Sequence, residues 1–488
     1  MMWKCGFNQC DLYHNTHVAA KTIMSSFFLP SKSKSRDKKA KKQQKLKKKQ
    51  DGKTSATGAK RKRRPETFNE EIESDSEVEG DDVRKGLTAL SSEDEYDVET
   101  APEKRLRLAK EYLSNLQEEE RAKTDDADFD QDAIAHRLRD DMLEQAGRLQ
   151  RKVADKYIAP DPGDIRKLRG HRLPVTCVVA TPDDKYVYSG AKDCCIIKWL
   201  VETGVKEVIF SGHRKGVEGV VGHTGHVLAL AVSSDGKFLA SGGQDRVVHV
   251  WDVKTNSHVH TFTGHRDTVS GLSFQRGTHE LFSCSFDRTL KVWNLDEMAY
   301  VETLFGHQDS VSSIDCMLRE RPISAGMNDR SVRIWKVAEE SQLVFHGHKS
   351  YIDAVRYVND EYFISGSQDG SVALWNVMKK KPMATRPHTA HKGHTEHWVT
   401  AVAAYTNTDL VASGSNDGQV CVWKCGEGFR SLEPCFSIPL NGFVNSLMFS
   451  HGGTFLVAAI GQEHRLGRWW TDKSVKNTIA IIPLKHSV

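Results

Sequence analysis

The chain has 488 residues, of which 38% are hydrophobic and 27% are charged, and its formal net charge is +4. The sequence holds no uninterrupted run of 18 apolar residues, which predicts that no helix spans a membrane. Its first 30 residues lack the pattern of a secretory signal peptide, and its ten cysteines are too sparse for a disulfide scaffold and form no CxxC pair. We therefore expect a protein that is not secreted and that holds neither a metal nor a cofactor.

The first 99 residues divide into blocks of opposite charge. Residues 32–64 carry 17 basic side chains and two acidic ones, whereas residues 66–99 carry 14 acidic side chains and two basic ones. Neither block has enough apolar residues to offset the entropy of ordering its backbone. Residues 1–99 are therefore predicted to form a disordered leader, and its basic runs at 38–49 and 60–64 are typical of a nuclear import signal.

Two helices are predicted over residues 100–160. The segment Thr100-Ala-Pro-Glu103 is a capping box with proline in the first turn, and it opens a stretch with apolar residues on one face. A helix is expected from about 101 to 122. A second apolar series runs mainly in steps of four, which predicts a helix over 131–157.

Three markers recur together six times in the rest of the chain. A Gly-His pair is followed 21 to 23 residues after its His by an Asp, and a Trp lies six residues after each Asp. The six sets are His171, Asp193 and Trp199; His223, Asp245 and Trp251; His265, Asp287 and Trp293; His307, Asp329 and Trp335; His348, Asp369 and Trp375; and His394, Asp417 and Trp423. Such constant spacing indicates an internal repeat.

The segments between these markers alternate buried-type and exposed-type residues, as in 247–251 and 289–293, which is typical of strands. The pattern resembles the WD40 repeat, whose unit is a four-stranded blade of a β-propeller. The resemblance implies that the His, a Ser of the second strand, the turn Asp and the Trp form a hydrogen-bonded ladder inside each blade. Serines suited to this role are Ser189, Ser241, Ser283, Ser365 and Ser413.

The expected fold is all-β, a seven-bladed WD40 β-propeller over residues 165–488, which gives about 46 residues for each blade. The seventh blade has no Gly-His start, and its first three strands are expected at 443–449, 454–460 and 462–469, with Glu463 at the place of the turn Asp. Its last strand is either 165–168 or 478–483. We favour 165–168, because pairing the two ends of the chain leaves no exposed strand edge.

A catalytic function is not expected. A His, a Ser and an Asp together could suggest catalysis, but the same trio in every blade indicates that each blade uses it to satisfy its own buried polar groups. Outside the repeats the sequence shows no isolated nucleophile, no glycine-rich phosphate loop and no cluster of metal ligands.

Basic residues occur at two fixed positions of the repeats. Arg246, Arg288 and Arg330 directly follow the turn Asp, and Arg172, Arg266 and Lys349 directly follow a Gly-His pair. By resemblance to the repeat family, both positions lie on one face of the ring. Arginine forks match phosphate geometry and stack on bases. We expect RNA contacts from Arg246, Arg266, Arg288 and Arg330, and in second place from His464, Arg465 and Arg468 near the seventh Trp.

Stretches outside the repeat signature carry a closer resemblance, among them EKRLRLAKEYL at 103–113, FTGHRDTVSGLSFQRGTH at 262–279 and GQEHRLGRWW at 461–470. They are similar to the WD40 proteins of the U3 small nucleolar ribonucleoprotein. The resemblance implies a non-catalytic nucleolar scaffold that binds the box B/C region of U3 small nucleolar RNA. Its implied partners are a kink-turn-binding small nucleolar protein and other processome proteins, and its implied role is processing of pre-18S ribosomal RNA as a monomer within that large particle.

One alternative belongs to a different class of function. A nuclear WD40 adaptor for protein–protein interaction, such as a ubiquitin-ligase receptor or a histone-tail reader, would need the basic leader only as an import signal. RNA recovered with the protein would distinguish the two classes.

Overall fold

The computed structural model describes residues 104, 106–108, 110–115, 137–143, 150–212, 221–388, 397–467 and 470–486. The predicted leader, residues 1–99, lies outside the described residues. None of the helices in the described part of the chain is long and apolar enough to cross a membrane.

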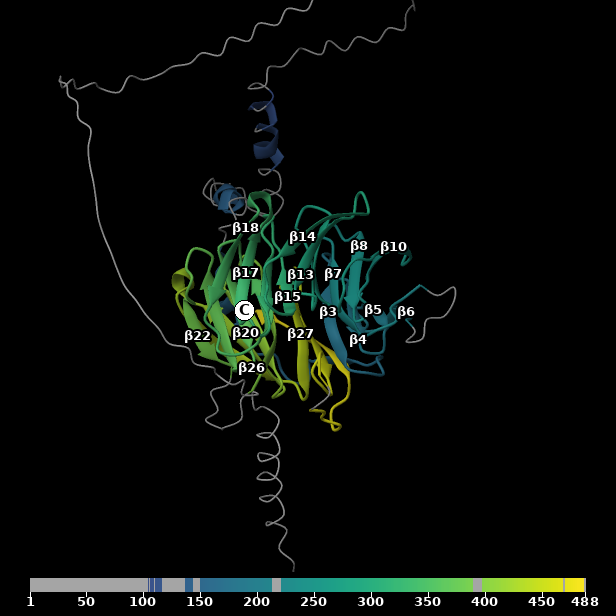
Figure 1. Cartoon of the computed structure of the whole chain (residues 1–488). Coiled ribbons are helices and arrows are strands. Elements are labelled where there is room, and N and C mark those ends of the chain that lie inside the picture. The colour runs from purple at the N-terminus through teal and green to yellow at the C-terminus, as the bar shows by residue number, and fades with distance from the viewer. Residues whose placement is uncertain are drawn as a thin grey trace, which may run out of the picture. The chain divides into compact units, whose positions relative to one another are not determined.

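Seven four-stranded antiparallel sheets form a closed ring (Figure 1). The innermost strands of neighbouring blades contact one another in chain order, and β27 (Phe443–Phe449) of the last blade contacts β3 (Val175–Ala180) of the first. Figure 1 shows these two strands side by side although they are far apart in the sequence. The chain therefore folds as the expected seven-bladed β-propeller.

The first four blades follow the chain without interruption. Blade 1 is β3 (Val175–Ala180), β4 (Tyr186–Ala191), β5 (Ile196–Leu200) and β6 (Lys206–Phe210). Blade 2 is β7 (Val227–Val232), β8 (Phe238–Gly243), β9 (Val248–Asp252) and β10 (His258–Phe262). Blade 3 is β11 (Val269–Phe274), β12 (Glu280–Ser285), β13 (Thr289–Asn294) and β14 (Ala299–Phe305). Blade 4 is β15 (Val311–Asp315), β16 (Ile323–Gly326), β17 (Ser331–Lys336) and β18 (Ser341–His346).

Blades 5 and 6 continue in the same way, and blade 7 combines strands from both ends of the chain. Blade 5 is β19 (Ile352–Tyr357), β20 (Tyr362–Ser367), β21 (Ser371–Asn376) and β22 (Ala384–Pro387). Blade 6 is β23 (Val399–Ala404), β24 (Leu410–Ser415), β25 (Gln419–Cys425) and β26 (Leu432–Pro439). Blade 7 is β27 (Phe443–Phe449), β28 (Phe455–Gly461), β29 (Thr478–Pro483) and β2 (Arg166–Leu168).

Burial follows the position of a strand within its blade. The second strands, such as β12 and β24, are almost wholly buried, because neighbouring blades cover both of their faces. The outermost strands, such as β14 and β22, are half-buried or exposed. The core is therefore a ring of apolar layers between the blades. The outer strands of the blades remain exposed and can contact other molecules.

Short polar side chains on the innermost strands join neighbouring blades. The hydroxyl groups of Thr176, Ser270, Ser312 and Thr400 each donate to a backbone carbonyl of the next blade. The amide of Asn445 in blade 7 donates to the carbonyl of Val175 in blade 1 at 2.8 Å, which continues this belt across the closure of the ring. Blade 5 carries an acid, Asp353, at the corresponding position of its innermost strand.

The seventh blade closes as favoured from the sequence, but its third strand was wrongly placed. Strand β2 pairs with β29 and forms the outer edge, so both candidate segments belong to the blade. The expected strand at 462–469 is not formed, because its described residues belong to the connection between β28 and β29. The apolar run of β29 fills the third place, where its residues Ile479 and Ile481 are buried.

The described residues of 104–115 and 137–143 are helical, as expected for the two predicted helices. The second helix does not reach residue 157. Residues Ala154–Lys156 form a short 3-10 turn, η1, and β1 (Tyr157–Ile158) pairs with β30 (Lys485–His486). The apolar residues at the end of the predicted helix do not form a helix face. Ala154 and Tyr157 are instead buried against blades 6 and 7.

Candidate nucleic-acid interface

The markers of blades 1 to 4 meet in hydrogen-bonded ladders at one edge of the ring. In blades 1 to 4 the Nε2 of the His lies 2.7–2.8 Å from a Ser hydroxyl, and the Trp indole donates to the same hydroxyl at 2.8–2.9 Å. The other His nitrogen lies 2.7–3.1 Å from the turn Asp. The residues in these four ladders are His171, Ser189, Asp193 and Trp199; His223, Ser241, Asp245 and Trp251; His265, Ser283, Asp287 and Trp293; and His307, Ser324, Asp329 and Trp335.

Ser324 was missed in the sequence because blade 4 has one extra residue before its turn Asp. In blades 1 to 3 the Ser lies four residues before the Asp, whereas Ser324 lies five before Asp329. In blade 5 the ladder is looser, since His348 bonds Ser365 at 2.6 Å and Ser371 at 3.1 Å, while Asp369 lies 4.0 Å away.

Blade 6 requires a correction. His394 was expected in its ladder but lies outside the described residues, and His388 occupies the place instead. The Nδ1 of His388 lies 2.8 Å from the Ser413 hydroxyl, which also accepts the Trp423 indole at 2.8 Å, and Asp417 lies 3.9 Å away. The Gly-His signature was therefore matched to the wrong histidine, because the connection before β23 contains several.

The bonds within the ladders and their burial shift the pKa values of their titratable groups. The His hydrogen bonds hold the pKa values of Asp193, Asp245, Asp287 and Asp329 below their usual range against the opposing effect of burial. Burial lowers the pKa values of His307, His348 and His388. Each Ser hydroxyl is buried and shared between a His and a Trp, so the trio offers no free nucleophile to a substrate.

The arginines after the turn Asp have an unusual backbone conformation. Arg246, Arg288 and Arg330 have φ values of 69°, 71° and 50°, in the left-handed region that residues other than glycine seldom adopt. Blades 5 and 6 place glycine at the same position, with φ values of 75° for Gly370 and 76° for Gly418. Blade 1 has the buried Cys194 there, with a φ of 67°, so the left-handed conformation belongs to the turn itself. What distinguishes blades 2 to 4 is that this position carries an exposed cation in each of them.

The basic residues after Gly-His lie at the same edge. The backbone N–H groups of Arg172, Arg266 and Lys349 donate to the turn Asp of their own blades at 3.0–3.2 Å. The Nη1 of Arg330 donates to the carbonyl of Lys349 at 3.4 Å, which links blades 4 and 5. We call this set of exposed cations the arginine arc; its members are Arg172, Arg246, Arg266, Arg288, Arg330 and Lys349.

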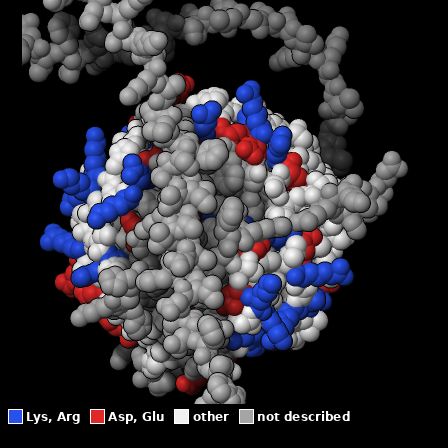
Figure 2. Space-filling model, turned by 60° about the horizontal axis from the view of Figure 1, so that its bottom comes forward, with Lys and Arg blue, Asp and Glu red and all other residues white. Residues whose placement is uncertain are grey.

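The arc holds charge that is not neutralised locally. Within the described part of the chain, the guanidinium groups of Arg246, Arg266 and Arg288 have neither a hydrogen bond nor an ion pair. Figure 2 shows one face of the molecule, on which Lys and Arg side chains gather in groups near the rim with Asp and Glu side chains among them. Basic charge is local there, so a polyanion would be held by particular groups rather than by a uniform field.

The second predicted RNA-binding set is corrected by the structure. His464 is buried, and burial together with the neighbouring Arg465 and Lys192 lowers its pKa to about 3. The Nη2 of Arg465 donates to the carbonyls of Ser312 at 2.9 Å and Asp353 at 3.0 Å, so its guanidinium is committed inside the central channel. Arg468 lies outside the described residues. His464 and Arg465 therefore brace the ring and do not form an external basic surface.

Sequence reasoning overlooked Trp470. Its side chain is 57% exposed, and its ring lies 6.4 Å from that of Trp398 and 6.3 Å from that of Phe443. An exposed aromatic beside a basic edge suits stacking of an unpaired base. The signal for it was the second Trp of the GRWW sequence. The first, Trp469, was interpreted as the marker of the seventh repeat, and Trp470 was not considered separately.

One group of described residues has metal-ligand types in proximity. Ligand atoms of His223, Asp245 and His249 lie within 4.8 Å of one another. The first two residues belong to the blade 2 ladder, and the Nδ1 of His249 lies 2.9 Å from the Thr261 hydroxyl. Burial and the adjacent His223 lower the pKa of His249 to about 3. A buried neutral histidine packed on the ladder accounts for this cluster.

The ring of seven blades and its internal ladders define a WD40-repeat β-propeller. The family model described as "WD domain, G-beta repeat" matches residues 163–199, 206–252, 256–294, 298–336, 339–376 and 385–424. The atypical blade 7 lies largely outside these matches.

Individual relatives show to which family of WD40-repeat proteins the chain belongs. The U3 small nucleolar RNA-interacting protein 2 of Mus musculus is 58% identical over 395 residues, which cover 80% of this chain and 83% of the mouse protein. The Homo sapiens protein of the same name is 55% identical over the same shares. The solved structure described as "Structure of U3-55K" matches with a TM-score of 0.64 and 52% identity, and it covers 67% of this chain and 100% of that one. The chain belongs to the family of U3 small nucleolar RNA-interacting protein 2.

Proposed function

We propose that this protein is a non-catalytic scaffold of the U3 small nucleolar ribonucleoprotein. In this proposal it binds U3 small nucleolar RNA in its box B/C region, next to a kink-turn-binding small nucleolar protein, and supports pre-18S ribosomal RNA processing in the nucleolar small-subunit processome. The names of the relatives that are 55% and 58% identical to it over 395 residues support this assignment. The repeated, closed ladders support a scaffold rather than an enzyme.

The observation that carries the RNA-binding part is the recurrence of an exposed arginine at the same left-handed turn of three successive blades. A left-handed conformation costs about 1 kcal/mol or more for a residue with a side chain. Blades 2, 3 and 4 each accept this cost at the same turn, and the result is an exposed guanidinium at one edge of the ring. A bent RNA presents closely spaced phosphates, and guanidinium forks on a rigid mount can contact several of them at once.

Replacing Arg246, Arg288 and Arg330 by glycine separates binding from folding. The triple variant loses three cations and also relieves three strained turns. We expect its affinity for U3 RNA, measured with the kink-turn-binding protein present, to fall by at least about tenfold, and the slope of log affinity against log salt to become shallower by roughly two to three. The free energy of unfolding should stay the same or rise, by up to about 1 kcal/mol at each site.

A matched control is Glu340→Gly. Glu340 is exposed and has a φ of 47°, so this change relieves the same kind of strain without removing an arginine. It should leave RNA affinity unchanged. Full RNA affinity in the triple glycine variant would rule out the arc as the RNA-binding surface, and recovery of protein partners without U3 RNA from cells would favour the adaptor class.

A further inference from the structure

A cavity lies at the edge of the ring that carries the ladders, between blade 1, blade 2 and the β28–β29 connection. Its volume is about 430 Å³. Ligand pockets range from roughly 300 to 1,000 Å³, so the cavity has room for a small planar group. The residues that line it include Lys192, Thr224, His226, Gln244, Arg465 and Leu466.

Two uncharged side chains of blade 2 are available in this cavity. Thr224 directly follows the ladder His, and Gln244 directly precedes the ladder Asp245. Both residues are exposed, and neither the Thr224 hydroxyl nor the Gln244 amide has a hydrogen-bond partner among the described residues. Their backbones are fixed, because the N–H of Thr224 donates to Asp245 at 3.1 Å and the N–H of Gln244 donates to the carbonyl of His226 at 2.8 Å. The cavity therefore offers an unused hydroxyl and an unused amide on a rigid mount.

The cations that line the cavity are committed to other groups. Lys192 donates to Glu463 at 2.7 Å, and Arg465 donates to two backbone carbonyls of the channel. Exposed members of the arginine arc flank the cavity instead. Arg246 lies two residues after Gln244, and the position that is a threonine in blade 2 is an arginine in blades 1 and 3. The cavity is thus a hydrogen-bonding site without an uncommitted charge of its own, surrounded by cations.

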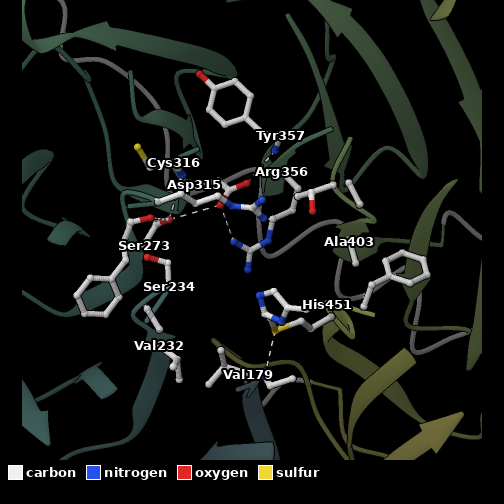
Figure 3. A pocket seen from close by; sticks show the side chains of 18 of the residues that line it. Val179, Val232, Ser234, Ser273, Asp315, Cys316, Arg356, Tyr357, Ala403 and His451 are labelled. Carbon is white, nitrogen blue, oxygen red and sulfur yellow. Dashed lines mark hydrogen bonds and ion pairs between the residues drawn. The ribbon is translucent and has the colours of Figure 1, made fainter. Parts of the chain in front are cut away.

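The opposite end of the channel provides a different environment. A pocket of about 280 Å³ opens there between the last residues of the innermost strands. Figure 3 shows Arg356 beside Asp315, and the apolar Val179 and Val232 also line this space. The Nη1 of Arg356 lies 3.3 Å from the Asp315 carboxylate, so this pair is balanced. The arginine arc lies at the other edge, and RNA bound to the arc is therefore next to the blade 2 cavity rather than this pocket.

We propose that the blade 2 cavity receives one unpaired base of the RNA that the arginine arc binds, an inference that rests on the proposed function. The arc contacts phosphates next to this nucleotide, and the Gln244 amide and the Thr224 hydroxyl bond the edge of its base. An amide presents a donor beside an acceptor, which matches the edges of unpaired bases. His226 and Leu466 provide a ring and an apolar side chain against which the base can pack. Because phosphate contacts position an RNA and base contacts specify it, the cavity supplies sequence preference that the arc lacks.

The first test measures the affinity of the full chain for a U3 box B/C RNA fragment with the kink-turn-binding protein present. Gln244→Met keeps the length of the side chain and removes both of its hydrogen-bonding groups. The affinity should fall at least about fivefold. The slope of log affinity against log salt should stay the same, because no phosphate contact is lost. Asn328→Ala is the matched control: Asn328 is an exposed amide directly before the ladder Asp of blade 4 and does not line the cavity, so its loss should leave the affinity unchanged.

The second test identifies the nucleotide. In a series of RNA fragments, each carries an abasic sugar at one unpaired position, which removes the base and keeps the phosphates. At one position the abasic sugar should weaken binding to the unchanged chain about as much as Gln244→Met does, and it should add little further loss in that variant.

The outcomes separate this inference from the proposed function. Full affinity in Gln244→Met together with a loss in the triple glycine variant of the arc would overturn the base pocket and leave the proposed function standing. Full affinity in both variants would overturn both proposals. Losses that simply add at every abasic position would show that Gln244 contacts no base.

Discussion

At the scale of single residues, the turn after the ladder aspartate meets two demands that conflict. The backbone there favours glycine, as Gly370 and Gly418 show, while an exposed edge that binds phosphate favours arginine. Arg246, Arg288 and Arg330 satisfy the second demand at the expense of the first. The sequence alone indicated that these arginines recur, but their left-handed backbone conformation depends on φ, which no spacing reveals.

The aspartate one residue earlier serves stability, and this can be tested in blade 3. One carboxylate oxygen of Asp287 accepts from the backbone N–H of Arg266 at 3.0 Å and lies 2.9 Å from His265 Nδ1, and the other accepts from the backbone N–H of Thr289 at 3.0 Å. Asp287→Ala leaves these buried donors without an acceptor, so the free energy of unfolding should fall by about 1 to 3 kcal/mol, measured by urea titration. Glu297→Ala, an exposed acid in the same blade, should change it little. An unchanged stability in Asp287→Ala would contradict the structural interpretation of the ladder.

The members of the ladders and the position of Arg465 show how much of the site could be predicted from the sequence. The ladders of blades 1 to 3 follow from constant spacing, whereas Ser324 and His388 depart from it. Only the structure identifies them: Ser324 accepts from the Trp335 indole, and His388 lies against the Ser413 hydroxyl. The fate of Arg465 could not be predicted, because a cation near a repeat marker looks the same in sequence whether it faces solvent or enters the channel.

At the scale of elements, blade 7 differs from the others because its second connection, between β28 and β29, is held from outside the blade. Lys192 in blade 1, which is 2% exposed, donates to Glu463 Oε1 at 2.7 Å and to the carbonyl of His464 at 2.7 Å. These bonds fix the β28–β29 connection over the channel, where Arg465 reaches blades 4 and 5. A sequence pattern that looks for a turn Asp six residues before a Trp cannot anticipate an acid whose cation lies 271 residues away.

The buried pair gives a prediction for this element. Lys192→Met leaves the Glu463 carboxylate buried without this cation, so we expect a loss of about 3 kcal/mol or more in the free energy of unfolding. Glu463→Gln in the same chain removes the unpaired charge, and the double variant should therefore be more stable than Lys192→Met alone. The comparison is made by chemical denaturation. If the two changes simply add, the pair does not act as a unit.

At the scale of the whole molecule, the buried ladders predict acid sensitivity. The pKa values of His307, His348 and His388 are lowered in the folded state, so the unfolded chain binds more protons, and stability is lost as pH falls below about 6.5. The lowered pKa values of Asp193, Asp245 and Asp329 add a second loss below about pH 4 by the same reasoning. Burial raises the pKa of Asp353 to about 6, and its protonation offsets part of the first loss.

The measurement is the midpoint of thermal unfolding between pH 8 and pH 4. We expect a plateau above about pH 7 and a progressive decrease below it. A midpoint that stays constant from pH 7 to pH 5 would contradict the assignment of neutral buried histidines to the ladders.

The way the ring closes has a consequence for how the molecule is made. Strand β2 (Arg166–Leu168) leaves the ribosome long before β29 (Thr478–Pro483), its hydrogen-bonded neighbour, has been synthesised. At ordinary elongation rates the interval is roughly 15 to 60 s, during which blades 1 to 6 can assemble in order while the first strand waits with its polar groups unpaired. Nascent chains stalled shortly before Thr478 would therefore carry six finished sheets and one incomplete one, with the edge that β29 later covers open to capture by a chaperone or by another chain.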